Sequence, residues 1–278
     1  METNGSKNRV ITITSGKGGV GKTNIVSNLA IALAKFGKKI LLLDADLGLG
    51  NLDILLGLKP KMNLSDVLME GKNIKDMIIE GPMGVKILPA SSGVLELTNL
   101  SENQKLQLLS ELESLNGAFD ILIIDTGAGI SSNVMYFNIA AQDIIVIITP
   151  EPTSIHDSLA LMKILSSNYD EKYFKVIVNF VRNPKEGFEV FKKLMSLIEE
   201  SFEASVDYLG QISYDRNVSK AVRKQKAVIE SFPDSTASMD FFKIAEKICA
   251  FQSKELPKGN IQFFWKQLLE EKKNKKRT

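Results

Sequence analysis

Short stretches of continuous apolar residues alternate along the chain with stretches in which apolar residues recur every three or four positions. Continuous apolarity is typical of strands buried on both faces, and the wider spacing is typical of helices with one buried side. The strand-like stretches are 10–14, 39–46, 85–90, 120–126, 143–149, 173–181 and 206–212. The helical patterns include 24–36, 101–115 and a helix opened by Ser154. This alternation predicts an α/β fold, with a mostly parallel sheet of seven to eight strands and helices on both faces.

The pattern changes near the C-terminus, where Pro257 and Gly259 interrupt the last helical stretch. Proline and glycine are the residues that most often end a helix. We therefore expect one domain over 1–254, a linker over 255–260 and a separate terminal segment over 261–278.

Composition narrows the functional classes. The net charge is +2, and no apolar run approaches the roughly 20 residues that span a bilayer. We therefore expect a cytoplasmic protein that is not built mainly to coat nucleic acid. The single cysteine, Cys249, excludes an internal disulfide and a cysteine-ligated metal cluster, and its apolar neighbours predict a buried thiol.

A glycine-rich loop follows the first strand-like stretch directly. Residues 16–23 match G-x-x-x-x-G-K-[ST] between a strand and a helix, which is the context of a phosphate-binding loop. In such a loop Lys22 bridges the β and γ phosphates, and the Thr23 hydroxyl binds Mg²⁺. The nucleotide-binding residues predicted from the loop are Gly16, Gly18, Gly19, Val20, Gly21, Lys22, Thr23 and Asn24.

Aspartates end two further strand-like stretches. Asp125 ends one of them, and Asp44 and Asp46 end the other. Because the carboxyl ends of parallel strands meet at one edge of the sheet, these three side chains should converge on the phosphate loop. We expect Asp125 to hold the metal through water. Asp46 lies farther into its loop, so we expect it to orient or activate the attacking water and to reach the metal through water.

The loop carries a second lysine, Lys17, that the general motif does not require. The pair Gly16-Lys17 resembles the deviant Walker A loop of the MinD/ParA family, and the likeness runs from residue 9 to about 250. In that family this lysine reaches across a dimer to the partner's phosphates. The resemblance therefore implies an ATP hydrolase that forms a homodimer on ATP, with Lys17 acting on the neighbouring nucleotide. It also implies that Asn179 contacts adenine, with Arg182 nearby. The sequence lacks the N-K-x-D motif that would favour guanine, so ATP is expected over GTP.

Several longer stretches resemble the flagellar-number regulators called FlhG, FleN or YlxH. They are 44–58, 63–71, 84–104, 124–137 and 149–165. The resemblance implies a switch ATPase that controls the number or placement of flagella, with partners such as the GTPase FlhF, flagellar switch proteins or a transcription regulator. It also implies switch regions at 46–53 and 125–132 and a partner-facing surface over 150–165. Only about nine polar residues precede the first strand, where several FlhG proteins carry a helix that stimulates FlhF.

The terminal segment has an amphipathic pattern. On a helix its apolar residues share one face, and a basic tail follows them. We expect this face to bind anionic lipid on the inner membrane surface, more strongly in a dimer that presents two copies. The alternative is a helix docked on its own domain. The predicted membrane contacts are Ile261, Phe264, Trp265, Leu268 and Leu269.

Two other functions remain open. The first is a MinD-like ATPase of division-site selection, although MinD typically has an arginine where this chain has Gly50. The second is a ParA-like DNA-partition ATPase, for which the basic residues of 220–226 would supply phosphate contacts. The only histidine, His156, is expected to be solvated rather than catalytic. We favour the flagellar regulator and expect no nucleic-acid partner.

Overall fold

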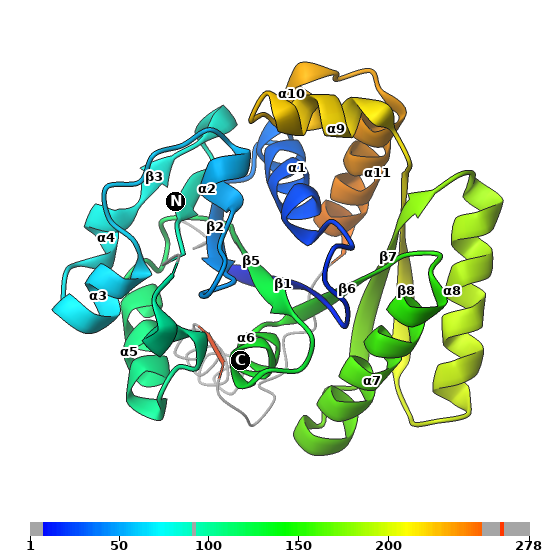
Figure 1. Cartoon of the computed structure of the whole chain (residues 1–278), viewed down its shortest axis with the longest axis horizontal. Helices are drawn as coiled ribbons and strands as arrows, with labels where there is room; N and C mark the ends of the chain where they lie inside the picture. The colour runs from blue at the N-terminus through cyan, green and yellow to red at the C-terminus, as the bar shows by residue number, and fades with distance from the viewer. Residues whose placement is uncertain (1–7, 91–92, 252–261, 264–278) are drawn as a thin grey trace, which may run out of the picture.

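A single sheet in the order β3-β4-β2-β5-β1-β6-β7-β8 forms the centre of the protein. The computed structural model describes residues 8–90, 93–251 and 262–263 (Figure 1). Neighbouring strands run parallel, except that β3 pairs antiparallel with β4. The predicted mostly parallel sheet is therefore confirmed. The strands are β1 (Arg9–Ser15), β2 (Ile40–Ala45), β3 (Ile79–Glu80), β4 (Lys86–Leu88), β5 (Ile121–Ala128), β6 (Asp143–Ile148), β7 (Tyr173–Val181) and β8 (Ser205–Ser213).

Helices cover both faces of this sheet. On one face α1 and α11 pack against the sheet, and on the other α5, α6, α7 and α8 do so, with α8 over β7 and β8 (Figure 1). The continuous apolarity of β2 and β6 follows from this arrangement, because every residue of both strands is buried. The helices are α1 (Lys22–Lys35), α2 (Leu52–Leu55), α3 (Leu64–Glu70), α4 (Ile74–Met77), η1 (Pro82–Gly84), η2 (Leu95–Thr98), α5 (Glu102–Glu113), α6 (Ser132–Ala140), α7 (Pro152–Tyr169), α8 (Pro184–Glu199), α9 (Arg216–Arg223), α10 (Val228–Ser231) and α11 (Thr236–Ala250).

Two local predictions were wrong. Helix α7 begins at Pro152, with Glu151 as its N-cap, and not at Ser154. Proline suits the first helical turn because its missing N–H needs no partner there. The Ser154 hydroxyl does not cap the helix, because it accepts a hydrogen bond from the Thr149 N–H at 3.0 Å. Cys249 is exposed on α11 and is not a core thiol, because it lies on the side of the helix that faces away from the sheet.

The last described residues return to the body of the domain. Phe263 is fully buried against α6, with its ring centroid 5.9 Å from that of Tyr136 and 6.5 Å from that of Phe137. Its backbone N–H donates to the Ala140 carbonyl at 3.0 Å. At this one position the terminal segment is docked on its own domain. The predicted linker over 255–260 and the predicted membrane contacts Ile261, Phe264, Trp265, Leu268 and Leu269 lie outside the described residues.

Nothing in the described part of the chain is a helix with both the length and the apolarity to cross a bilayer. The feature that matters most for function is the edge of the sheet where β1, β2 and β5 end. β1 lies between β5 and β6, and Asp44 of β2 is the register partner of Asp125 of β5. This register brings two carboxylates beside the loop that follows β1.

Candidate nucleotide site

The loop between β1 and α1 is shaped by its glycines. Gly19 and Gly21 have φ of 78° and 92°, in the left-handed region that residues with a side chain rarely adopt. Gly21 is also the N-cap of α1, so the turn delivers the chain directly into the helix N-terminus. A side chain at Gly21 would have its Cβ 2.6 Å from the Asn179 amide nitrogen. The strand, loop and helix predicted for a phosphate site are therefore all present, with exposed glycines at the turn.

Lys22 lies at the start of α1 and points back into this loop. Its amine donates to the Ser15 hydroxyl at 3.0 Å. Burial lowers the pKa of Lys22, and the nearby carboxylates of Asp125 and Asp46 act against that shift. A partly desolvated amine close to two carboxylates is well placed to exchange them for the stronger negative charge of a triphosphate.

Asp125 is the buried carboxylate of the site. Burial raises its pKa, and the Thr23 hydrogen bond and the Lys22 charge oppose this shift, while Asp46 adds to it. One of its oxygens, Oδ1, is buried without a hydrogen-bond partner. A buried carboxylate oxygen without a partner costs free energy, and a metal-bound water would satisfy it. The residues therefore fit the predicted arrangement, in which Thr23 binds Mg²⁺ and Asp125 holds it through water.

The three aspartates differ in their contacts and their burial. Asp44 accepts hydrogen bonds from the backbone N–H groups of Asp46 at 3.2 Å and Leu52 at 3.1 Å, so it shapes the loop after β2. Burial, together with the charge of Asp125, raises the pKa of Asp44. Asp46 is only half-buried, and its carboxylate lies 3.8 Å from where a Cβ on Gly127 would be, beside the second predicted switch. Asp46 is thus the most solvent-accessible of the three carboxylates.

These carboxylates do not form a metal site by themselves. Within the described residues no group of three or more His, Cys, Asp or Glu side chains is arranged to hold an ion. That Asp125 and Asp46 act through water, while phosphate oxygens and the Thr23 hydroxyl supply the direct ligands, stays a prediction.

Gly50 marks a tightly packed point in the first predicted switch. A Cβ at this position would lie 2.3 Å from the Ala90 Cβ and 2.8 Å from an Asp44 carboxylate oxygen. An arginine, which MinD typically has here, does not fit without a shift of this loop.

A small pocket beside Asn179 is suited to the base. Its lining includes Gly21, Asn24, Phe180 and Tyr214. The Asn179 side-chain amide donates to the Val20 carbonyl at 2.8 Å, which leaves its oxygen to accept from the amino group of adenine. Guanine presents a carbonyl oxygen at that position, and two acceptors would repel each other. Contact between Asn179 and adenine stays a prediction.

Sequence reasoning missed the aromatic walls of this base pocket. Phe180 has φ of 60°, a backbone conformation that is strained for a residue with a side chain, and its side chain is 41% exposed. Tyr214 is 65% exposed. Exposed rings next to a nucleotide site offer stacking surfaces for a base. The available signal was their position at the carboxyl ends of two strands, because Phe180 is the second-last residue of β7 and Tyr214 directly follows β8.

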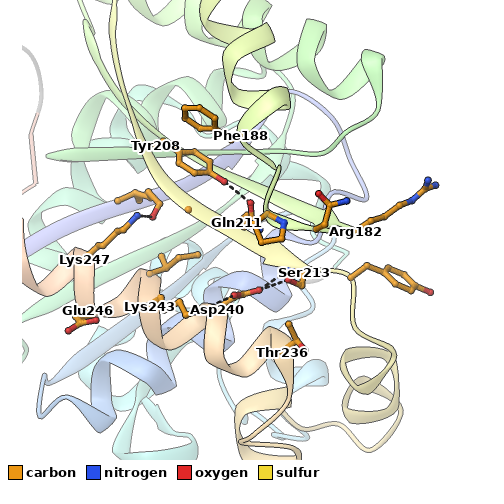
Figure 2. Close-up of a pocket in the computed structure, with 16 residues that line it drawn as sticks. Arg182, Phe188, Tyr208, Gln211, Ser213, Thr236, Asp240, Lys243, Glu246 and Lys247 are labelled. Carbon is orange, nitrogen blue, oxygen red and sulfur yellow. Dashed lines mark hydrogen bonds and ion pairs between the residues drawn. The ribbon is translucent and has the colours of Figure 1, made fainter. Parts of the chain in front are cut away.

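Arg182, which the resemblance places near the base, does not line this base pocket. It borders a neighbouring pocket of about 900 Å³ between β8, α8 and α11, and extends outward from the rim (Figure 2). Its backbone N–H donates to the Glu186 carboxylate at 2.5 Å. Contact between Arg182 and adenine stays a prediction.

Lys17 occupies a different place from Lys22. Its amine donates to the Glu151 carboxylate and to the Thr153 hydroxyl, at 2.9 Å in the second case. Both partners stand at the start of α7. The two lysines of the loop are therefore separated, with Lys22 turned into the loop and Lys17 held at the neighbouring helix.

His156 and the basic residues of 220–226 lie outside the site and are exposed to solvent. His156 is exposed on α7, as expected for a solvated side chain. The basic residues Lys220, Arg223, Lys224 and Lys226 are exposed on and after α9. Within this group Lys220 bonds the Asn217 side chain at 3.3 Å, and the Lys224 amine lies 5.4 Å from the Phe232 ring centroid. These local contacts are typical of a solvated helix surface.

Comparisons with known proteins identify a family model, relatives and solved structures that are similar to this chain. The chain matches the family model described as an AAA domain over residues 8–176. It is 42% identical to the antiactivator FleN of Pseudomonas aeruginosa, with 94% of each chain covered. It is 33% identical to the flagellum site-determining protein YlxH of Helicobacter pylori, with 96% of this chain and 91% of that protein covered. The structure of the septum site-determining protein MinD complexed with Mg-ADP, from Pyrococcus horikoshii, is similar with a TM-score of 0.73 at 26% identity, covering 87% of this chain and 96% of that one.

Proposed function

This chain belongs to the family of P-loop ATPases that includes FleN, YlxH and MinD, and from that membership we propose that it is a slow, ATP-driven switch in flagellar regulation. Its cofactors are ATP and Mg²⁺, and its general reaction is ATP hydrolysis. In the proposed cycle ATP brings two copies together, the dimer associates with the inner membrane surface, and hydrolysis separates the copies again.

The chain's own residues account for nucleotide binding. Backbone N–H groups of the loop from Gly16 to Gly21 and the N-terminus of α1 hold the phosphates, and Lys22 neutralises them. Mg²⁺, when bound, neutralises further phosphate charge, with Thr23 as its ligand and Asp125 holding its water. The base enters the pocket beside Asn179.

Hydrolysis needs a water held in line with the terminal phosphate. In this proposal Asp46 orients that water, and its half-buried carboxylate beside Gly127 of the second predicted switch supports the assignment. Lys17 supplies charge to the nucleotide of the neighbouring protomer, as an arginine finger does in other NTPases. Hydrolysis removes the terminal phosphate that both protomers contact, so the dimer loses the contacts that favoured it.

One observation supports the flagellar role above the others. FleN is 42% identical to this chain with 94% of each covered, so the likeness includes the predicted switches and extends beyond the phosphate loop. FleN is described as an antiactivator, and YlxH as a flagellum site-determining protein. We propose that this chain acts in the same way, through a protein partner that is an activator or a component of the flagellum.

A MinD-like role in division is the second candidate. The similarity to MinD from Pyrococcus horikoshii, with a TM-score of 0.73, supports it. The packing around Gly50 favours the flagellar role, because the arginine that MinD typically has at this position does not fit in this conformation. Retention of a flagellar or a division partner by the ATP-loaded chain would separate the two candidates.

The membrane step rests on the terminal segment. Its sequence over 261–278 combines apolar and aromatic residues with a basic tail. We propose that two copies in a dimer bind anionic lipid together, since a second weak anchor on the same particle binds at high effective concentration. Phe263 packs on α6, so membrane binding of this segment competes with docking at that position.

Light scattering of the full chain with Mg²⁺ and either ADP or ATP tests the switch. We expect a monomer with ADP, a dimer with ATP, and accumulation of dimer in Asp46→Ala, which should still bind ATP. Vesicles of phosphatidylglycerol and phosphatidylethanolamine should recruit the ATP-loaded chain and fail to recruit a chain that lacks residues 260–278. A monomer under every nucleotide condition would refute the proposal. ATP-dependent binding to random DNA that falls steeply with salt would favour the partition role instead.

A further inference from the structure

Gln225, which follows α9, has an unusual backbone conformation and a long-range contact. Its φ is 52°, in the left-handed region that costs free energy for a residue with a side chain. From this position its side-chain amide donates to the Ile54 carbonyl of α2 at 3.1 Å, across 171 positions of the chain. A strained residue therefore contacts the short helix in which the first predicted switch ends.

The backbone of Gln225 also fits closely against the end of α2. Gly57 lies two residues after α2, and a Cβ on it would lie 3.3 Å from the Gln225 carbonyl oxygen and 3.4 Å from the Gln225 Cβ. Gly57 has φ of 66°, and its N–H donates to the same Ile54 carbonyl at 3.1 Å. The turn that ends α2 is therefore held by its own chain on one side and by Gln225 on the other.

The segment that carries Gln225 is anchored to the rest of the domain. Asp215, the N-cap of α9, accepts a hydrogen bond from the Ala237 N–H of α11 at 3.3 Å. After Gln225, the Ile229 N–H donates to the Asn28 side-chain oxygen of α1 at 3.1 Å in the interior. Gln225 is thus fixed from both directions along the chain, and it can serve as a support for α2.

Helix α2 determines where the loop that carries Asp46 ends. The Leu52 N–H at the start of α2 donates to the Asp44 carboxylate at 3.1 Å. Helix α2 has only four residues, which is too short to be stable alone, so its position depends on the contacts that it makes. Asp44 holds its first end, and core packing together with Gln225 holds its second. A displacement of α2 would move the loop over 46–51, and Asp46 with it.

We propose that Gln225 is a positioning residue for ATP hydrolysis, because its bond to the Ile54 carbonyl holds the loop over 46–51 and so keeps Asp46 at the attacking water. This inference rests on the proposed function, in which Asp46 orients that water. Gln225 belongs neither to the phosphate loop nor to the lining of the base pocket. It therefore acts on hydrolysis and leaves nucleotide binding unchanged.

Two substitutions remove this hydrogen bond in different ways. Gln225→Glu keeps the shape of the side chain, but its carboxylate has no proton to donate to the Ile54 carbonyl. Gln225→Gly removes the side chain and relieves the backbone, because glycine readily adopts a positive φ. In urea Gln225→Gly should therefore unfold at or above the midpoint of the wild type, so that a loss of activity in this variant does not arise from a loss of stability.

The test is steady-state ATP hydrolysis by the full chain with Mg²⁺, with kcat and KM determined separately. Both variants should lower kcat about 2- to 13-fold, the factor by which one hydrogen bond of ~0.5–1.5 kcal/mol shifts an equilibrium between two loop positions. Affinity for a non-hydrolysable ATP analogue, measured by competition with a fluorescent nucleotide, should not change.

Gln107→Glu is the matched control. The Gln107 side-chain amide donates to the Val67 carbonyl at 3.0 Å, between α5 and α3. The variant therefore loses the same kind of hydrogen bond between two helices that carry no residue of the proposed site. Its kcat and its affinity for the analogue should equal those of the wild type.

The outcomes separate the two levels of the argument. If Asp46→Ala hydrolyses ATP as fast as the wild type, the proposed role of Asp46 fails, and the role of Gln225 fails with it. If Asp46→Ala is inactive and either Gln225 variant keeps the wild-type kcat, only the positioning role is overturned. An equal loss of kcat in Gln107→Glu, or a loss of analogue affinity in the Gln225 variants, would also overturn it.

Discussion

Replacing Gly16 with alanine tests how the phosphate loop is held. The added Cβ would lie 2.1 Å from the Asp157 carbonyl carbon, 2.2 Å from its oxygen and 2.4 Å from the Ser158 nitrogen. All three atoms are backbone, so no side chain can rotate to make room. An ordinary contact needs about 3.4 Å, and the loop or α7 must therefore shift by roughly 1 Å. Gly16 does not have a positive φ, so the cost arises from this contact and not from the backbone conformation.

Gly18→Ala is the control within the same loop. A Cβ on Gly18 meets nothing within 4 Å, and its φ is not positive either. Overpacking should make Gly16→Ala less stable by ~1–3 kcal/mol. Gly18→Ala should stay within about 0.5 kcal/mol of the wild type, as expected for a substitution that meets open space.

Urea unfolding of the nucleotide-free chain, followed by far-ultraviolet circular dichroism, measures both effects. The single tryptophan, Trp265, lies outside the described residues, so backbone dichroism is the better signal. The m-values should agree among the three proteins, because the same surface is exposed on unfolding. Equal midpoints for Gly16→Ala and wild type, or equal losses for the two variants, would refute the packing of the loop on α7.

Three further predictions follow from the site and the fold. Burial raises the pKa of Asp44 to about 8 and that of Asp125 to about 7, so the native state holds protons that the unfolded state releases. The free energy of unfolding should therefore fall as the pH rises from about 4 through these values. Thermal melts of the nucleotide-free chain between pH 5 and 8 should show a melting temperature that falls with pH, and Asp44→Asn should make that fall smaller. Phe263→Ala should lower the free energy of unfolding by ~3 kcal/mol, the low end for a buried phenylalanine. Phe251→Ala is the control and should cost less, because that side chain is 40% exposed. Equal losses of the two variants in urea unfolding would contradict the docking of Phe263. Asn179→Ala should weaken ATP binding about 2- to 13-fold, as expected for one lost hydrogen bond, and should weaken GTP binding less. A competition assay with a fluorescent nucleotide measures both affinities, and an unchanged ratio of the two would remove Asn179 from base recognition.

Most of the sheet could be predicted because its strands are buried on both faces. Continuous apolar stretches such as 143–149 leave a clear signal, and each predicted strand is present. The two-residue β3 was missed, since Ile79–Glu80 is too short to show any period. The start of α7 was misplaced because Ser154 has the residue type of an N-cap, while its hydroxyl is used by the Thr149 N–H. Competing hydrogen bonds of this kind depend on tertiary structure.

The phosphate loop and its aspartates could also be predicted, because strand ends in a parallel sheet meet at one edge whatever the details of packing. The surroundings of Lys17 could not. Glu151 lies 134 residues along the chain from Lys17, and only the position of β6 next to β1 brings α7 to the loop. The rings of Phe180 and Tyr214 that line this pocket were missed for a similar reason, since they come together only when β7 and β8 pair.

The central claim is that Lys17 serves the nucleotide of the neighbouring protomer. The most direct measurement is a crystal structure of Asp46→Ala with ATP and Mg²⁺. The account predicts a dimer in which each Lys17 amine has left Glu151 and lies about 3 Å from a phosphate oxygen held by the partner. A protomer whose Lys17 still pairs with Glu151, or contacts the phosphates of its own nucleotide, would contradict it.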